Sequence, residues 1–279
     1  MKIFLHLFWL SLILLTGCSD STDQLNEDFG EPQVRDRIVN PNNTLAHQFL
    51  TEVKPILESR CVVCHGCYDA PCQLKLSSVD GIDRGFSPEE VYATRFKEIE
   101  PTRLLIDARD TQAWRDKKFP FKPVLNERNQ TPIANLQGSV LYQLLKQKNL
   151  HPSPAAGALP HSFDFSLTRS QTCPSIETLE DYQEDQPLAG MPYGLPAIDK
   201  KEFTILKNWV EQGAPMAQPL AISDSISQRV DAWEKRLNGQ SNKEILINRY
   251  IYEHLFLGHI YFSEEVIKSN KLPIYFRLV

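Results

Sequence analysis

The feature that most constrains this chain of 279 residues is the motif Cys61-Val62-Val63-Cys64-His65. Two cysteines at this spacing form thioethers with the two vinyl groups of a haem, and the histidine that follows brings its imidazole to one face of the iron. A zinc or redox Cys-x-x-Cys motif is the alternative, but no second Cys/His pair at zinc spacing follows. The motif therefore predicts one covalent haem c, with His65 as an iron ligand.

The ligand on the opposite face of such an iron must come from a distant part of the chain. After the leader, the sequence contains two methionines, Met191 and Met216. Met191 lies in a loop ahead of a predicted helix, which is the order typical of cytochromes c, whereas Met216 follows that helix and fits a packing role. We therefore expect Met191 to bind the iron, with His151, His161 or an open position as the alternatives. His/Met ligation raises the reduction potential, whereas an open position gives a substrate access to iron.

The N-terminus predicts export. Lys2 precedes a largely apolar run from Ile3 to Leu15, which is short for a membrane span and typical of a signal peptide. The run leads into Thr16-Gly17-Cys18, the pattern of a bacterial lipobox, with a plain cleaved signal as the alternative. We therefore expect a lipoprotein signal peptide over 1–17, lipidation of Cys18, and a periplasmic protein anchored to the outer membrane. The haem c maturation machinery, which works in that compartment, is then an expected partner.

Polarity and periodicity divide the mature chain into three parts. Residues 18–43 are polar and lack apolar periodicity, which predicts a flexible tether. Residues 44–216 are predicted to form a cytochrome c-like haem domain with a loop-rich insertion at about 74–186. Residues 217–279 are predicted to begin a further helical region. The predicted fold class is mainly α.

Apolar positions at intervals of three and four residues locate the expected helices. The first begins at Thr44, expected as its N-cap, and Pro55 interrupts or kinks it. Asp199 is expected to cap another helix, which Gly213 ends. A third helix is expected to begin at Ser87-Pro88-Glu89-Glu90. Three more are expected over 135–146, about 225–237 and about 244–262.

Three cysteines beyond the motif leave the disulfide pairing open. Cys67 and Cys72 can close a small loop that leaves Cys173 buried and free, or Cys173 can link one of them to the segment before Met191. His254 and His259 are five apart, do not share a helical face, and are expected to be structural.

The net charge of −5 and the pI near 5.8 exclude the basic surface of a nucleic-acid-binding protein. We therefore expect no nucleic-acid partner.

Three stretches resemble the bacterial fatty acid cis/trans isomerases. They run from Arg60 to Leu76, from Gly190 to Pro196 and from Arg249 to Leu257, and the likeness extends from about Val53 to Phe262. The resemblance implies a periplasmic haem c enzyme that converts cis-unsaturated acyl chains of membrane phospholipids to the trans form. By that resemblance, His65 and Met191 are the expected catalytic residues.

Members of that family are much longer, and this chain ends soon after the third stretch. We therefore expect 217–279 to be the start of a truncated downstream region and the chain alone to bind haem without isomerising lipid. An electron-transfer lipoprotein and a haem peroxidase are the rival functions. The roughly 125 residues between the haem motif and Met191 exceed what a carrier needs, and no local motif supplies the distal base of a peroxidase.

Overall fold

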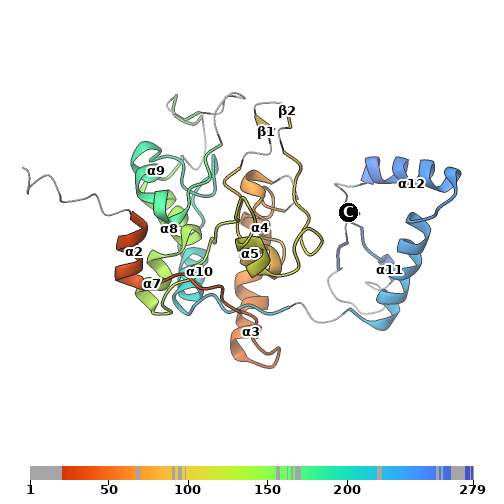
Figure 1. Cartoon of the computed structure of the whole chain (residues 1–279), viewed down its shortest axis with the longest axis horizontal. Helices are drawn as coiled ribbons and strands as arrows, with labels where there is room; N and C mark the ends of the chain where they lie inside the picture. The colour runs from red at the N-terminus through yellow and green to blue at the C-terminus, as the bar shows by residue number, and fades with distance from the viewer. Residues whose placement is uncertain are drawn as a thin grey trace, which may run out of the picture. The chain divides into compact units, whose positions relative to one another are not determined.

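The computed structural model describes residues 21–66, 70–89, 92–93, 96–97, 99–154, 158–161, 163–164, 166, 171–218, 222–255, 258, 260–264, 274–276 and 278. It is mainly helical, as the sequence predicts (Figure 1). The chain divides into two compact units, Met1–Gln218 and Pro219–Val279.

The first unit contains most of the helices. They are α2 (Ser21–Phe29), α3 (Thr44–Gln48), a π-helical turn (Phe49–Val53), α4 (Lys54–Arg60), α5 (Val79–Arg84), α6 (Thr111–Arg115), α7 (Pro132–Gln137), α8 (Val140–Leu150), α9 (Leu179–Asp185) and α10 (Lys200–Glu211), with 3-10 turns at Pro71–Gln73 and Ile176–Thr178. Two short strands, β1 (Tyr92–Ala93) and β2 (Phe96–Lys97), pair antiparallel, with Tyr92 opposite Lys97.

The predicted first helix is present, but its start and its proline differ in detail from the prediction. Asn43 is the N-cap, accepting a hydrogen bond from the Leu45 N–H, so Thr44 is the first helical residue instead of the cap. Pro55 lies in the first turn of α4, directly after the π-helical turn. A proline is tolerated there because the first N–H groups of a helix have no partner within it.

Two other predictions are wrong in part. The helix predicted from 87 is absent from the described residues there, where β1 and β2 form a small hairpin; the valine, threonine and aromatic residues of 91–96 favour strand over helix. The helix predicted over 135–146 is divided into α7 and α8, because Ser139 accepts a hydrogen bond from the Tyr142 N–H and starts a new helix.

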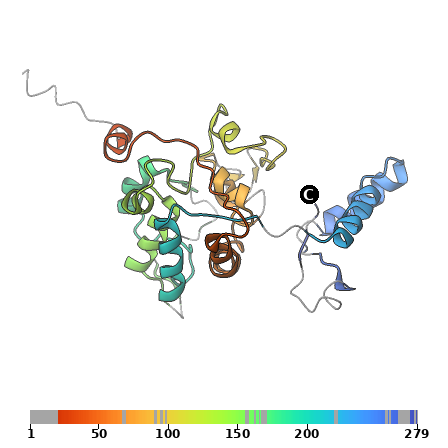
Figure 2. The same cartoon turned by 90° about the horizontal axis from the view of Figure 1, so that it is seen from below.

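The main core lies where α10 packs against α7, α8 and the π-helical turn. Figure 2 shows α10 beside α7. Asp199 and Glu202 form a capping box at the start of α10, and Gly213, at a φ of 85°, follows its end, as the sequence predicts. The rings of Phe49 and Trp209 lie 6.0 Å apart in this core.

Within residues 18–43, which the sequence predicts to be a flexible tether, the structure shows a helix and several long-range contacts. Residues 21–29 form α2, and Arg37 is buried, donating to the Asp83 carboxylate at 2.6 Å and to the Asn126 carbonyl at 2.7 Å. The main chain on either side of Ile38 also pairs with Met216, at 2.8 Å in both bonds. This polar segment was predicted to be disordered, but its buried Arg37 side chain pairs with the Asp83 carboxylate.

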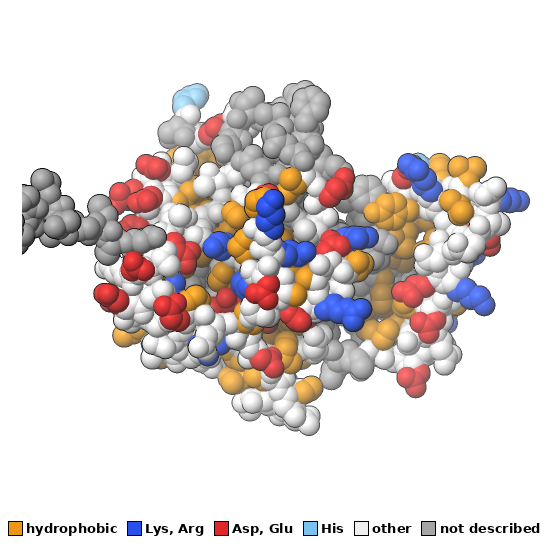
Figure 3. All heavy atoms as spheres, viewed as in Figure 1, with side chains coloured by type: hydrophobic (Ala, Val, Ile, Leu, Met, Phe, Trp, Pro, Cys, Tyr) orange, Lys and Arg blue, Asp and Glu red, His pale blue; other side chains and the backbone are white. Residues whose placement is uncertain are grey.

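The second unit contains α11 (Asp224–Leu237), capped by Ser223, and α12 (Asn242–Leu255), so both helices predicted in this region are present, the second ending earlier than predicted. Large apolar side chains are exposed on this unit (Figure 3), namely Trp233, Ile245, Leu246, Ile247, Tyr250, Tyr252, Leu255, Tyr261, Ile274 and Tyr275. Among the helices that the structure describes, none has both the length and the apolar character required to cross a membrane.

Candidate haem site

The haem motif follows directly from the end of α4. The Cys61 N–H donates to the Leu57 carbonyl at 2.9 Å, and the His65 N–H donates to the Cys61 carbonyl at 2.9 Å, so the motif continues as a tight turn. Cys61 is half-buried and Cys64 is exposed, and neither is in a disulfide. Both thiols are therefore free for covalent attachment.

A cavity of about 400 Å³ brings the distant predicted residues together. Cys61, Cys64, His65 and Met191 all line it, although His65 and Met191 are far apart in the sequence. The volume is that of an ordinary cofactor or ligand site. Much of the remaining wall is apolar, including Leu57, Leu74, Leu76, Phe86, Val124, Val140, Leu141, Leu144, Leu145, Pro192, Leu195 and Leu206.

The surroundings of His65 favour the neutral form of its imidazole. Burial lowers the pKa of its imidazole, and the nearby carbonyls of Leu74 and Pro71 only partly oppose that shift. Within the described part of the chain, no group hydrogen-bonds to its buried Nδ1 atom, and its own carbonyl accepts from the Leu76 N–H at 2.8 Å. A neutral imidazole is the form that binds a metal ion.

Burial favours the thiol form of Cys61. Burial raises the pKa of this thiol to about 11, and the nearby Cys64 and Glu202 add to the shift. The thiolate is the form that exchanges disulfides, so Cys61 is a poor partner in such exchange.

Met191 is held in the cavity wall by its backbone and by packing. Its N–H donates to the Leu144 carbonyl at 3.0 Å, and its side chain packs against the cluster of Val140, Leu144 and Leu179. The Met191–Pro192 peptide is cis. Gly190 lies so close to α8 that a Cβ at this position would be 2.4 Å from the backbone nitrogen of Lys148.

The other candidate ligands do not line the cavity. Met216 is fully buried in the core, in keeping with its predicted packing role. His151 and His161 are exposed and are not among the lining residues. His254 lies on α12, with its Nδ1 atom 2.8 Å from the Tyr250 carbonyl, whereas His259 and Cys18 lie outside the described residues.

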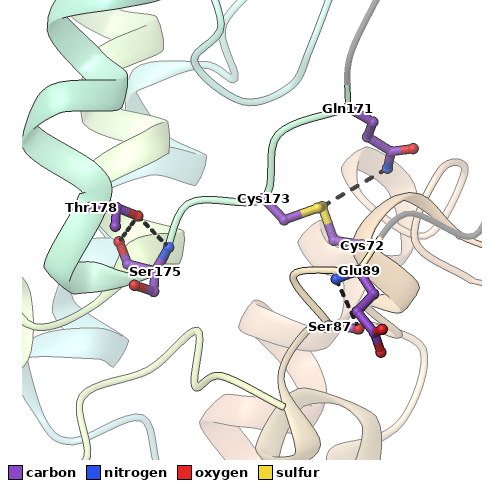
Figure 4. The surroundings of a disulfide bond; sticks show 7 residues. All are labelled: Cys72, Ser87, Glu89, Gln171, Cys173, Ser175 and Thr178. Atoms are coloured by element: carbon purple, nitrogen blue, oxygen red, sulfur yellow. Dashed lines mark hydrogen bonds between the residues drawn. A yellow bond between two sulfur atoms is a disulfide. The ribbon is translucent and has the colours of Figure 1, made fainter. Parts of the chain in front are cut away.

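One disulfide, Cys72–Cys173, joins two walls of the cavity (Figure 4). Of the pairings that the sequence left open, it is the one that links the haem-motif segment to the segment before Met191. Cys67 lies outside the described residues.

Two polar features of the cavity were not predicted. Arg60 lines it and pairs with Glu202 of α10, with Nε at 3.1 and 3.0 Å from the two carboxylate oxygens. Tyr193 also lines it and donates from its hydroxyl to the Asp164 carbonyl at 3.1 Å. Arg60 and Tyr193 both lie in stretches that resemble the isomerase family, but neither contact could be predicted, because the partners are far apart in the chain.

A family model described as fatty acid cis/trans isomerase matches residues 99–279, which is most of the chain. The matched range includes Met191 and α12 and begins after the haem motif. No curated protein and no solved structure matches the chain significantly. The match covers well over half of the sequence, and the chain belongs to the fatty acid cis/trans isomerase family.

Proposed function

We propose that this isomerase acts through a haem c, which Cys61 and Cys64 would hold covalently and whose iron His65 and Met191 would bind. Family membership implies cis-to-trans isomerisation of unsaturated fatty acyl chains. The observation that carries the haem assignment is the single cavity that both motif cysteines, His65 and Met191 line.

The residues present fit this group. Two free cysteines at the attachment spacing flank the cavity, and burial favours the neutral imidazole that binds iron. A methionine thioether is an established ligand of the iron in c-type haems, and Met191 would supply one. The apolar walls suit a large, flat, mostly apolar group.

Rotation about a carbon–carbon double bond requires its π bond to be weakened for a moment. A bound ferric haem would supply an electron acceptor that lowers this barrier. The protein's own contribution is a largely apolar enclosure, in which Leu141, Leu144 and Leu145 exclude water and provide contacts for an acyl chain. Met191 would have to be a displaceable ligand of that group, because a permanently bound thioether would keep the double bond away from the iron.

The proposed substrates are cis-unsaturated acyl chains of membrane phospholipids, as the family resemblance implies. The proposed location is the periplasm, with the lipid on Cys18 holding the enzyme at the outer membrane. An anchored enzyme gains effective concentration at the surface that contains its substrate.

The test is the fatty acid composition of cells after solvent shock, measured by gas chromatography. Strains with the intact gene, a deletion, and a deletion complemented with His65→Ala are compared with one carrying Met216→Leu, a volume-conserving control. We expect a raised trans/cis ratio only with the intact gene and with Met216→Leu. A trans/cis ratio that rises as much in the His65→Ala strain as with the intact gene, at equal protein level, would contradict the haem assignment.

A further inference from the structure

The Cys72–Cys173 disulfide lies between the two halves of the proposed haem site. Cys72 follows His65 by seven residues, Cys173 precedes Met191 by 18, and the two cysteines are 101 apart in the sequence. Both cysteines line the cavity that contains His65 and Met191. In Figure 4 the bond crosses from the Cys72 turn to the segment that leads through Ser175 toward α9.

The Cys72 end of this bond is fixed by the haem-motif segment. Cys72 and Gln73 have φ values of 58° and 48°, in the left-handed region that non-glycine residues rarely occupy. The buried Gln73 side chain maintains this turn by accepting from the N–H and the hydroxyl of Thr102, both at 2.7 Å. The Cys72 carbonyl accepts from the Ser87 N–H at 2.8 Å. Cys72 is therefore a rigid attachment point.

The Cys173 end leads directly to the packing around Met191. Pro174 is buried, and Ser175 forms a capping box with Thr178 that starts the turn before α9. Leu179, the first residue of α9, is buried in the cluster with Leu144 against which Met191 packs. The disulfide thus fixes the beginning of the helical segment that supports Met191.

A second contact joins the segment before Cys173 to the Met191 loop. The Asp164 carbonyl accepts from the Tyr193 hydroxyl at 3.1 Å, and the rings of Phe163 and Tyr193 lie 4.8 Å apart. Tyr193 is two residues from Met191. The Met191 loop is therefore supported from both sides of the disulfide along the chain.

We propose that the Cys72–Cys173 disulfide is a positioning element that holds Met191 opposite His65. This inference rests on the proposed function, since it concerns the ligand of the proposed haem. The cysteines act through Met191 and do not touch the reacting atoms. A covalent link between the two halves lowers the population of states in which Met191 has left the iron. With haem bound, the disulfide would thereby limit the access of a double bond to the iron.

The test compares the full chain with a Cys72→Ser/Cys173→Ser double variant, both produced in a host with haem c maturation. Two spectroscopic readouts are taken: the weak near-infrared sulfur-to-iron band of the ferric protein, and the rate of carbon monoxide binding to the ferrous protein. We expect the double variant to retain its covalent haem, lose the band, and bind carbon monoxide about tenfold faster, because the ligand-free state is no longer a minor one. The control is Val53→Ala, which weakens the core without altering the cavity wall.

A direct chemical experiment covers the case in which the double variant does not fold. The wild-type protein is treated with a dithiol, which closes to its own disulfide while the Cys72 and Cys173 sulfurs each gain a proton, and mass spectrometry confirms the reduction. The same rise in carbon monoxide binding is expected. An unchanged rate after complete reduction would overturn the inference and leave the proposed function intact. Absence of covalent haem from the wild-type protein would overturn both.

Discussion

Gly190→Ala tests whether the Met191 loop is held by its close approach to α8. The new Cβ would lie 2.4 Å from the backbone nitrogen of Lys148 and 2.8 Å from the Cα of Lys148. Both atoms belong to the backbone of α8 and cannot move aside, so the loop must shift by roughly 1 Å to reach ordinary contact distance. The shift also lengthens the hydrogen bond between the Met191 N–H and the Leu144 carbonyl, now 3.0 Å.

The expected loss of stability is about 2 kcal/mol. Overpacking of this kind costs roughly 1–3 kcal/mol, the hydrogen bond contributes about 1 kcal/mol, and the lower entropy of unfolded alanine offsets about 0.5 kcal/mol. Urea unfolding followed by haem absorbance reports on the first unit and should show a midpoint lower by about 1 M. The sulfur-to-iron band should weaken in parallel.

The matched control is Gly239→Ala in the second unit, where the new Cβ meets only the side chain of Glu244. Glu244 belongs to the second unit, so Gly239→Ala should leave the urea midpoint reported by the haem absorbance and the sulfur-to-iron band unchanged. A Gly190→Ala protein with an unchanged midpoint and an unchanged band would refute the reasoning about the loop.

Two further predictions concern ligation and buried charge. Met191→Ala should abolish the sulfur-to-iron band while Met216→Leu leaves it unchanged; a band that persists in Met191→Ala would assign the ligand elsewhere. Burial raises the pKa of Asp83 to about 6, against the attraction of Arg37. The folded state therefore binds a proton that the unfolded state releases near pH 4, and stability should fall by about 3 kcal/mol as pH rises from about 4 to above 6. Asp83→Asn should remove this part of the pH dependence in urea titrations, and an identical slope in the variant would contradict the assignment.

Local patterns predicted the parts of the fold that local interactions determine. The Asp199 cap, the end of that helix at Gly213 and the helices of the second unit all follow from residues close together in the sequence. The start of α8 was missed because Ser139 acts as a cap inside an otherwise continuous apolar pattern. The hairpin near residue 93 was missed because a proline followed by two acidic residues is also a typical helix start.

Long-range pairing explains what the sequence did not predict. Arg37 and Asp83 are buried as a pair, and the residues next to each of them in the sequence do not indicate this contact. The choice of Cys173 as the partner of Cys72 likewise depends on the path of the chain between them. The contacts of Arg60 and Tyr193 also depend on partners that are distant in the sequence. Cys61, Cys64 and His65, in contrast, lie within five residues, so their chemistry can be predicted from the sequence.

Haem staining of the polypeptide after denaturing electrophoresis tests the central assignment most directly. The full chain is expressed in cells that also mature a known c-type cytochrome, which serves as an internal control. The stain should follow the wild-type polypeptide and the Met191→Ala variant, because attachment needs only the motif, and should be lost in Cys61→Ala/Cys64→Ala. Full-length wild-type protein that does not stain beside a stained control, or that loses its haem to acid acetone, would contradict the account.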